Sequence, residues 1–454
     1  MAAEIHTATG HLPPFWDKSV IFFANILSLF YGNLAETEVL KKEVGALETY
    51  GSRLLPLVDL MFRQRGNVLV LEVAPDGHLV DYFQSELRLT LPEVRVIPHA
   101  VYAELGGDYA AMSAAAKQAF DGLKELDNQW LDGYVVDNIL IRLAGHLGKK
   151  TIGTREGSRK GNDKMLLQRF LESQGLSVFE SHEAGDVEEI NAAMRRLAVH
   201  GYHEAVIKAP IGASGVGMIK FPAQKVCVAS DFPEYIFFEG KVLVQGWLDE
   251  HIPGVQVVGS PSVQLFVGLD EAFLYDVTDQ ILSADSIHEG NVAPPRFFSQ
   301  GHDCRAELLR QARIIAEWLH GEGYRGPGSI DFQVIRRDGN LEIRVCEVNA
   351  RVTGATYPAL LARTFLPGGA WMMRNIRFDP QHNTDNLLGV IDEAGLLFRP
   401  GQDTGILPFN FNPDSEGRVI KGQFLFLSPD MHGCEESIRR MQAVDKIKGV
   451  YDRD

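Results

Sequence analysis

The 454-residue chain contains only four cysteines and no long hydrophobic run. Cys227, Cys304, Cys346 and Cys434 are widely spaced and form no CxxC pair, which excludes a structural zinc ribbon or a disulfide framework. No stretch reaches the ~20 apolar residues that a membrane-spanning helix needs. We therefore expect a reduced, cytoplasmic protein that does not interact with membranes.

The chain also lacks an excess of positive charge. Its formal net charge is -16, which argues against a general nucleic-acid binder but leaves room for a local basic pocket. The apolar fraction of 45% and the charged fraction of 23% are typical of a globular protein. A chain of this length is expected to form two or three domains.

One early apolar segment, residues 19–29 (SVIFFANILSL), has the length of a signal-peptide core. Glu4 and Asp17 precede it, Lys18 is the one nearby cation, and no small-x-small cleavage site follows. We therefore interpret this segment as a buried strand that runs into a loop.

Residues 1–150 alternate strand-like and helix-like segments. The apolar runs 68–73 (VLVLEV) and 94–97 (VRVI) predict strands, and residues 135–147 have helical spacing before Gly148. This alternation indicates a parallel sheet covered by helices. No complete GxGxxG follows a strand, so a dinucleotide site in this region is only weakly supported.

Beyond residue 150 the pattern changes. Residues 162–164 (NDK) precede an amphipathic helix that Asp163 or Asn162 can cap. Residues 204–220 predict a strand, a glycine-rich turn and a second strand. We divide the remaining chain at 151–250, 251–378 and 379–454. The last segment is expected to be an extension with a loop at 410–417, a strand at 422–427 and a final helix at 435–446.

The segment 329–351 (SIDFQVIRRDGNLEIRVCEVNAR) predicts a β-hairpin around an Asp-Gly turn. Glu347 and Asn349 lie two residues apart on one strand, so their side chains share a face, and the hairpin brings Asp331 towards them. Three hard oxygen ligands suit Mg²⁺. The alternative interpretation is an ordinary acidic hairpin with a solvated face.

This hairpin resembles the metal-binding signature of ATP-grasp ligases, through Asp331-Phe332 and the run Glu347-Val348-Asn349-Ala350-Arg351. The resemblance implies an α/β and α+β protein: an N-terminal parallel α/β domain, a two-lobed ATP-grasp fold and a small C-terminal extension. It also implies ATP and two Mg²⁺ ions, for which Mn²⁺ can substitute, with Asp331, Glu347 and Asn349 as the metal ligands.

A glycine-rich loop and two lysines precede the hairpin. The sequence PIGASGVG at 210–217 resembles the mobile ATP-grasp loop that covers nucleotide phosphates, and this assigns Gly212, Ser214, Gly215 and Gly217 to nucleotide binding. It is not a Walker A loop, because no Gly-Lys-Ser/Thr follows. Lys208 and Lys164 resemble the two phosphate-side lysines. A plain hairpin turn and a solvated lysine at a helix start are the alternatives.

The segment VLVQGWLD at 242–249 resembles the hinge strand on which adenine rests, which assigns Gln245, Gly246, Trp247, Leu248 and Asp249 to the nucleotide site. In ATP-grasp proteins glutamate often stands at the position of Gln245. Because this chain departs from that pattern, we take Asp249 as the candidate for the ribose contact. Packing of Trp247 in the core is an equal alternative.

Two arginines are candidates for stabilising the reacting groups. Arg296 ends a polar turn at 279–296, which is otherwise a surface loop, and Arg351 follows the metal ligands. A guanidinium can bind a carboxylate or phosphoryl group through two hydrogen bonds. Arg344 is an alternative for this role.

The chain resembles carboxylate–amine ligases. Within that group it resembles the pheganomycin-type peptide ligases of secondary (antibiotic) metabolism, although no single short motif carries this second resemblance. It implies a soluble enzyme that joins an amino-acid-like carboxylate to a peptide or amino-acid amine through an acyl phosphate, with a homodimer as an open possibility. A phosphotransferase acting on a hydroxyl and a nucleotide-binding protein without turnover remain alternatives. The sequence does not name either substrate.

Overall fold

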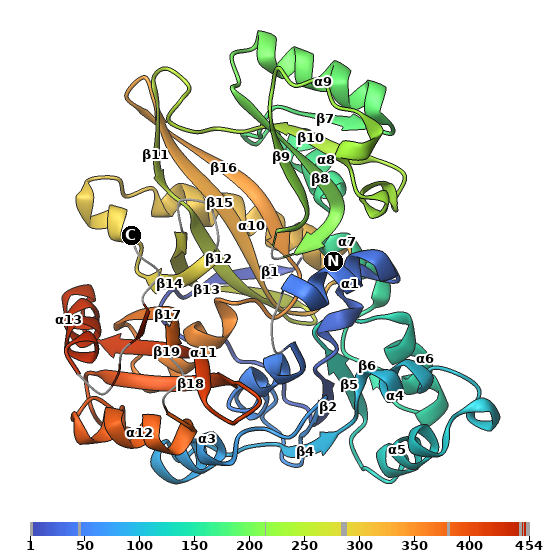
Figure 1. Ribbon diagram of the computed structural model, residues 1–454, viewed down its shortest axis with the longest axis vertical. Helices are drawn as coiled ribbons and strands as arrows, with labels where there is room; N and C mark the ends of the chain where they lie inside the picture. The colour runs from blue at the N-terminus through green and yellow to red at the C-terminus, as the bar shows by residue number, and fades with distance from the viewer. Residues whose placement is uncertain are drawn as a thin grey trace.

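The computed structural model describes residues 3–43, 47–213, 215–282, 288–378, 382–444, 447 and 449–450. Three sheets of five, four and eleven strands organise this part of the chain. In Figure 1 the five-stranded sheet lies at the lower right, the four-stranded sheet at the upper right, and the large sheet runs from the centre to the lower left.

The five-stranded sheet is parallel, as the alternating pattern of the first 150 residues predicts. Its order is β4-β3-β2-β5-β6, and the predicted strand within 19–29 is β2, buried at every position. Its strands are β2 (Val20–Phe23), β3 (Val68–Leu71), β4 (Glu93–Val96), β5 (Trp130–Gly133) and β6 (Lys150–Thr151).

Helices and helical turns join these strands. Asp76 caps α3 through its side chain, and Gly148 ends α6 in the left-handed conformation at φ 67°. The helical elements of this region are η1 (Ile26–Phe30), α1 (Leu34–Glu43), η2 (Leu47–Leu54), α2 (Val58–Met61), α3 (Gly77–Asp81), η3 (Tyr82–Glu86), α4 (His99–Glu104), η4 (Tyr109–Ala111), α5 (Ala114–Lys124) and α6 (Asn138–Leu147).

The four-stranded sheet is antiparallel in the order β7-β10-β8-β9. Asp163 caps α8 by accepting from the N–H groups of Met165 and Leu166, as expected. The elements of this lobe are α7 (Arg155–Gly161), α8 (Lys164–Ser173), β7 (Ser181–Ala184), α9 (Val187–Val199), β8 (Glu204–Ala213), β9 (Val216–Pro222), η5 (Ala229–Asp231), η6 (Glu234–Phe237) and β10 (Val242–Gly246).

The large sheet follows the order β11-β15-β12-β13-β14-β17-β19-β18, with β16 beside β15, β1 beside β13 and β20 beside β17. Its strands are β1 (Glu4–Thr7), β11 (Val255–Gly259), β12 (Pro261–Val267), β13 (Glu271–Leu282), β14 (His288–Ala293), β15 (Gly326–Arg337), β16 (Asn340–Asn349), β17 (Ala370–Phe378), β18 (Gly405–Pro413), β19 (Val419–Ser428) and β20 (Gly449–Val450). The accompanying helices are η7 (Arg296–Gln300), α10 (Arg305–Gly321), α11 (Thr356–Phe365), α12 (Thr384–Glu393) and α13 (Met431–Gln442).

The predicted hairpin is formed by β15 and β16. Asp338 and Gly339 both have positive φ, at 50° and 86°, between the paired residues Arg337 and Asn340. This is the two-residue turn whose twist matches that of antiparallel strands. The turn sets the register of the hairpin as far as the pair Phe332 and Val345, and a one-residue bulge next to this pair then places Asp331 opposite Glu347.

The C-terminal strands are part of the main sheet. β19 pairs with both β17 and β18, so residues beyond 378 extend the sheet of the preceding segment. The expected loop at 410–417 is wrong in its first half, because residues 410–413 continue β18. Alternating apolar residues from Ile406 to Phe411 were the overlooked strand signal.

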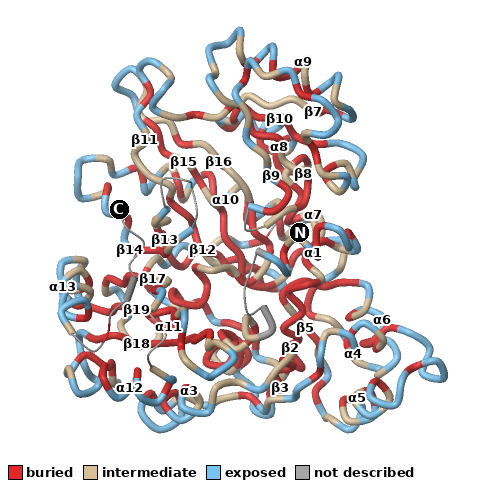
Figure 2. Tube along the Cα trace, viewed as in Figure 1, coloured by how far each residue is buried: buried red, intermediate tan, exposed pale blue. Residues whose placement is uncertain are grey.

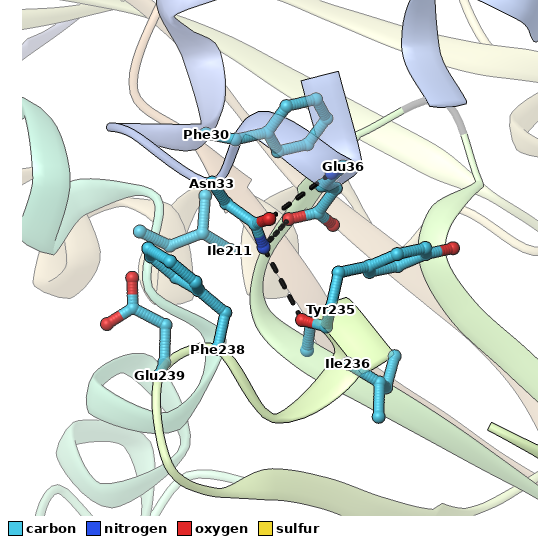
Figure 3. Close-up of a pocket in the computed structure, with 9 residues that line it drawn as sticks. Phe30, Asn33, Glu36, Ile211, Tyr235, Ile236, Phe238 and Glu239 are labelled. Carbon is cyan, nitrogen blue, oxygen red and sulfur yellow. Dashed lines mark hydrogen bonds between the residues drawn. The ribbon is translucent and has the colours of Figure 1, made fainter. Parts of the chain in front are cut away.

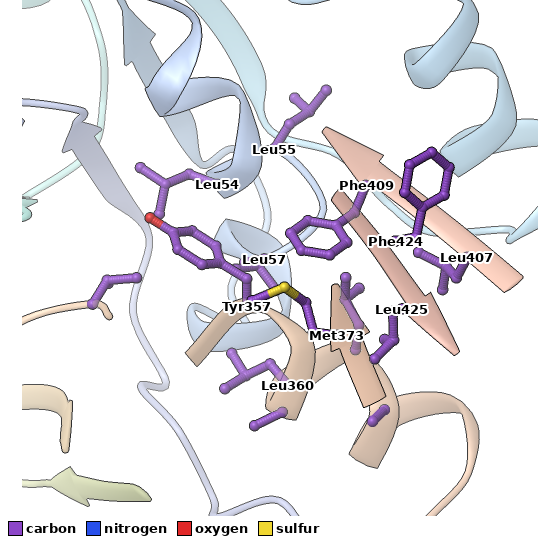
Figure 4. Packing of buried hydrophobic residues seen from close by; sticks show 14 of the residues in the cluster. Leu54, Leu55, Leu57, Tyr357, Leu360, Met373, Leu407, Phe409, Phe424 and Leu425 are labelled. Carbon is purple, nitrogen blue, oxygen red and sulfur yellow. The ribbon is translucent and has the colours of Figure 1, made fainter. Parts of the chain in front are cut away.

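One apolar core joins the N-terminal and C-terminal regions. Figure 4 shows Leu54 and Leu57 beside Tyr357 of α11, Met373 of β17 and Leu425 of β19. Figure 2 shows the same continuity as buried chain that runs from β2 and β5 into β17, β18 and β19. No described helix is long and apolar enough to cross a membrane.

The structure predicts that Gly157 in α7 is required for packing. An added Cβ would lie 2.3 Å from the carbonyl carbon of Gly323, so Gly157→Ala forces backbone apart. We expect Gly157→Ala to lower the free energy of unfolding by about 1–3 kcal/mol in urea titrations. Gly145→Ala in α6 is the matched control, since nothing lies within 4 Å, and it is expected to gain about 0.5–1 kcal/mol. Equal stability of the two variants would contradict this account.

Candidate active site

Asp331, Glu347 and Asn349 meet at one end of the β15–β16 hairpin. The amide of Asn349 donates to Oδ2 of Asp331 at 2.9 Å and to Oε1 of Glu347 at 3.3 Å. Ser262 of β12 donates to Oδ1 of Asp331 at 2.6 Å. The predicted oxygen ligands therefore form one cluster, and Ser262 is an addition to it that no motif in the sequence indicated.

The two carboxylates respond differently to this crowding. Burial and the neighbouring Glu347 raise the pKa of Asp331 to about 7. Burial also disfavours the ionised form of Glu347, but Lys164, Arg351 and Lys208 outweigh it and lower the pKa of this carboxyl. Without a cation the pair therefore carries its negative charge chiefly on Glu347.

The donor set fits Mg²⁺. Two carboxylates and an amide oxygen are hard ligands, and a divalent cation would allow both carboxylates to ionise. Rotating the Asn349 amide by 180° exchanges its oxygen and nitrogen and turns the oxygen towards such an ion. The described part of the chain contains no group of three His, Cys, Asp or Glu side chains placed to hold a metal ion. This cluster has two carboxylates, so its third ligand to Mg²⁺ would be the amide oxygen of Asn349.

Lys164 and Lys208 both lie close enough to Glu347 to lower the pKa of its carboxyl. Nζ of Lys164 is 3.2 Å from Oε2 of Glu347 and donates to the carbonyl of Gly212 at 3.3 Å. Lys208 donates to Oε1 of Gln245 at 2.7 Å. Burial lowers the pKa of Lys208, although Cys346 and Glu347 act in the opposite direction. An anionic ligand here would raise the pKa of this lysine.

The glycine-rich turn lies against the N-terminal region. Gly217 has φ 79°, and a Cβ at this position would be 2.5 Å from Oε1 of Glu36 in α1. Figure 3 shows Glu36 and Asn33 facing the segment of η6 that contains Tyr235. Ser214, predicted to bind phosphate, lies outside the described residues.

Glu36 was not predicted, because a carboxylate on an amphipathic helix usually faces water. It is only 2% exposed, accepts from Asn33 at 3.1 Å, and its Oε1 is buried without a hydrogen-bond partner. Burial raises its pKa to about 7 despite the nearby Lys164. The carboxyl is therefore largely protonated below neutral pH.

Arg351 is tied to the start of α8. Its Nη1 donates to Oδ1 of Asn162 at 2.5 Å, and Nδ2 of Asn162 donates to the carbonyl of Ala350 at 3.2 Å. Asn162, which we considered only as a helix cap, thus connects the lysine-bearing helix to the end of the metal strand. This connection holds Arg351 next to the carboxylate cluster, where it lowers the pKa of Glu347.

Arg296 and Arg344 occupy other places. Arg296 forms an ion pair with Glu435 of α13 at 3.1 Å, and its side chain is 47% exposed. Arg344 pairs with Glu342 at 2.6 Å and donates to the carbonyl of Val178. No described contact joins either guanidinium to Asp331, Glu347 or Asn349. The structure thus brings Arg351, and not Arg296, to the cluster.

The predicted hinge strand ends β10. Gln245 is buried between Lys208 and Ser181, and the N–H groups of Gly246 and Trp247 donate to the carbonyls of Glu180 and Glu204. Two backbone donors of this segment are therefore used within the protein.

The last residues of this segment have structural partners too. Leu248 is buried and its carbonyl accepts from Gln333 at 3.1 Å, while Asp249 accepts from the N–H of His251 at 2.9 Å. The ring of Trp247 lies 5.0 Å from Nζ of Lys220. The role of these residues in binding a nucleotide stays a prediction.

Comparison with solved structures identifies the fold. The chain superposes on the ADP complex of N5-carboxyaminoimidazole ribonucleotide synthetase with a TM-score of 0.59 and 11% identity, covering 94% of this chain and 96% of that one. A Campylobacter jejuni biotin carboxylase gives a TM-score of 0.54 and 13% identity, covering 95% and 92%. Both are ATP-grasp enzymes, so the expected fold is confirmed.

One curated relative was found by sequence. A [butirosin acyl-carrier protein]–L-glutamate ligase of Niallia circulans is 29% identical over 201 residues. This match covers 44% of this chain and 45% of the relative, so it spans less than half of either protein. No family model matches the chain.

The raised pKa of Glu36 predicts a pH-dependent stability. Its folded-state pKa, about 7, is above the ordinary value, so ionising the group destabilises the folded protein as pH rises through this range. Glu36→Gln removes that cost. We expect the variant to exceed the parent by about 2–3 kcal/mol at pH 8 and by far less at pH 5, in urea unfolding at each pH. A difference that is the same at both pH values would refute the assignment.

Proposed function

We propose that this chain, whose ATP-grasp fold is established, is an ATP-dependent ligase that joins a carboxylate to an amine through an acyl phosphate and releases ADP and phosphate. The observation that carries the proposal is the meeting of Asp331, Glu347 and Asn349 with Lys164 and Arg351. Such a cluster offers both a cation site and fixed positive charge.

The charges at the site suit a polyphosphate. Lys164, Lys208 and Arg351 surround Glu347, which retains its negative charge, and they lower its pKa. Bound Mg²⁺ would add positive charge that neutralises phosphate oxygens in the transition state. Lys164 and Lys208 would then contact the anionic nucleotide that replaces their present partners, Glu347 and Gln245.

The covalent steps need anion stabilisation and exclusion of water. A substrate carboxylate oxygen attacks the γ-phosphorus of ATP, ADP leaves, and an acyl phosphate forms. The amine then attacks the acyl carbon, loses a proton and expels phosphate. Arg351, held by Asn162, is placed to stabilise the anionic oxygens. The glycine-rich segment 212–217 would cover the phosphates and keep water from the acyl phosphate.

The substrates proposed are an amino-acid-like carboxylate and the amine of an amino acid or peptide, in the manner of secondary-metabolite peptide synthesis. The Niallia circulans relative is named as a ligase of L-glutamate and an acyl-carrier protein. That name supports an amino acid as the carboxylate and adds an acyl-carrier protein to the acceptors to be tested. A cytoplasmic homodimer remains part of the proposal.

The proposal predicts phosphate release that needs both a carboxylate and an acceptor, with ATP and Mg²⁺ present. The product mass should equal the sum of the two partners minus water. Glu347→Gln is expected to reduce kcat/KM by about 10²–10³-fold, because it removes a metal ligand worth several kcal/mol. ADP without phosphate, with a product heavier by a phosphoryl group, would instead identify a phosphotransferase.

Substitution separates the two candidate arginines. Arg351→Ala is expected to lower kcat by about 10²-fold, as for loss of one transition-state hydrogen-bond donor. Arg296→Ala breaks a half-exposed ion pair with Glu435 and should change kcat by less than about threefold. Steady-state phosphate release measures both. A larger loss in Arg296→Ala than in Arg351→Ala would return the catalytic role to Arg296.

A further inference from the structure

Arg53 is a buried cation without an acidic partner among the residues that the structure describes. It lies near the end of η2 and is 9% exposed. No hydrogen bond or ion pair in the described part of the chain includes its guanidinium, and its Nε is buried without a hydrogen-bond partner. A buried charge that no opposite charge compensates is costly. Such a group needs a functional or structural reason.

Aromatic rings hold this guanidinium in place. Its central carbon lies 3.9 Å from the ring centroid of Tyr50 and 5.9 Å from that of Tyr357. The hydroxyl of Tyr357 is 2.6 Å from that of Tyr134. These rings orient a planar cation and supply hydrogen-bonding groups beside it, but they do not neutralise its charge.

The charged neighbours of Arg53 do not neutralise it either. His288 is buried, and the positive charges of Arg53 and Lys421 both disfavour its protonation, so its pKa is lowered. Glu289, the next residue of β14, pairs with Arg374 at 3.5 Å. Among the described residues no carboxylate forms an ion pair with Arg53.

Amide side chains border this region. Gln423 of β19 stands directly opposite Asn375 of β17 and Asn410 of β18. Its Nε2 donates to Asn375 at 2.8 Å, whereas its Oε1 is buried without a partner. Thr49 of η2 donates to Asn412 at 3.3 Å, which places η2 against the same strands. The strands packed against η2 therefore carry a row of amide side chains, one of which has an acceptor without a hydrogen bond.

This region adjoins the end of the metal strand. Tyr357 stands six positions after Arg351, near the start of α11. A Cβ on Gly354 would lie 3.6 Å from Cε1 of His288. Residues 351–357 therefore connect the carboxylate cluster to the side chains around Arg53.

We propose that Arg53 binds a non-reacting carboxylate of a substrate, so that the enzyme prefers substrates carrying a carboxylate besides any that reacts. The inference rests on the proposed ligase function. Two sources have this chemistry: a second carboxylate on the acyl donor, such as that of a dicarboxylic amino acid, or the free carboxylate of an amino-acid or peptide acceptor. A guanidinium recognises either through two parallel hydrogen bonds.

Stability of the ligand-free protein separates binding from structure. Arg53→Gln removes a buried charge without removing a hydrogen bond, so its thermal midpoint should equal or exceed that of the parent. Arg65→Gln, an exposed arginine of the same region, is the matched control. A large drop in the midpoint of Arg53→Gln alone would identify a structural residue and overturn the proposal.

Carboxylate binding is tested without turnover. Glutarate is added to the protein in the absence of ATP, with glutaramide as the neutral probe. Glutarate should raise the midpoint of the parent and of Arg65→Gln by about 2–4 °C and leave Arg53→Gln unchanged. Arg53→Lys keeps the charge without the planar fork and should respond weakly. Equal responses of parent and Arg53→Gln, or no response in either, would overturn the proposal.

Kinetics then identify the source. L-Glutamate is compared with L-glutamine as donor, and glycine with glycinamide as acceptor. Arg53→Gln should raise KM by about 10–10²-fold for the free acid of one pair, with kcat little changed and no penalty for its amide.

The outcomes distinguish the two proposals. An active ligase in which Arg53→Gln changes no KM would remove the Arg53 assignment and leave the ligase intact. Arg53-dependent protection by glutarate, with no ligation of any partner, would sustain the carboxylate site and remove the ligase.

Discussion

The site depends on two carboxylates that the hairpin register forces together. The turn at Asp338 and Gly339 sets the register of β15 and β16, and a bulge beside Phe332 and Val345 places Asp331 opposite Glu347. Burial makes it unfavourable for both carboxyls to be ionised without a cation. Neighbouring side chains contact both carboxyls and offset the repulsion between them. Lys164 reaches Glu347 from α8, Asn349 bridges the two carboxyls, and Ser262 donates to Asp331 from the neighbouring strand. An arrangement of this kind is stabilised by a divalent cation and an anionic ligand together.

The groups around the cluster come from three separate parts of the chain. Glu36 of the N-terminal region touches the glycine-rich turn, Lys208 comes from the four-stranded sheet, and Arg351 follows the large sheet. Closure of the turn over a nucleotide would therefore alter contacts with α1 as well as with the phosphates. Below neutral pH the carboxyl of Glu36 is largely uncharged, so it would not repel nucleotide phosphates under the glycine-rich turn. The C-terminal strands complete the same body, because they share a sheet with β17 and a core with η2.

The sequence predicted those features that depend on local pattern. Turn chemistry at 338–339, the cap at Asp163 and the apolar runs of β2 and β3 are each decided by neighbouring residues, and the structure has them. The proximity of the three predicted metal ligands was predictable in part: Glu347 and Asn349 share a strand face, but the bulge that brings Asp331 opposite Glu347 has no signal in the sequence.

Features that depend on distant packing were not predictable. The environment of Glu36 results from contacts with β9 and η6, residues about 180 to 200 positions away, and Arg53 is surrounded by side chains of α11 and β14. Arg296 has a suitable side chain, but its partner is set by the position of α13 against the sheet. Residue type and spacing cannot report such long-range neighbours.

The measurement that tests the central claim most directly is trapping of the acyl phosphate. The protein is incubated with ATP, Mg²⁺, hydroxylamine and amino-acid carboxylates, without an acceptor. The account predicts a hydroxamate formed in equal amount with ADP and phosphate, and none from Glu347→Gln. ADP release accompanied by a stable phosphorylated substrate, with no hydroxamate, would contradict it.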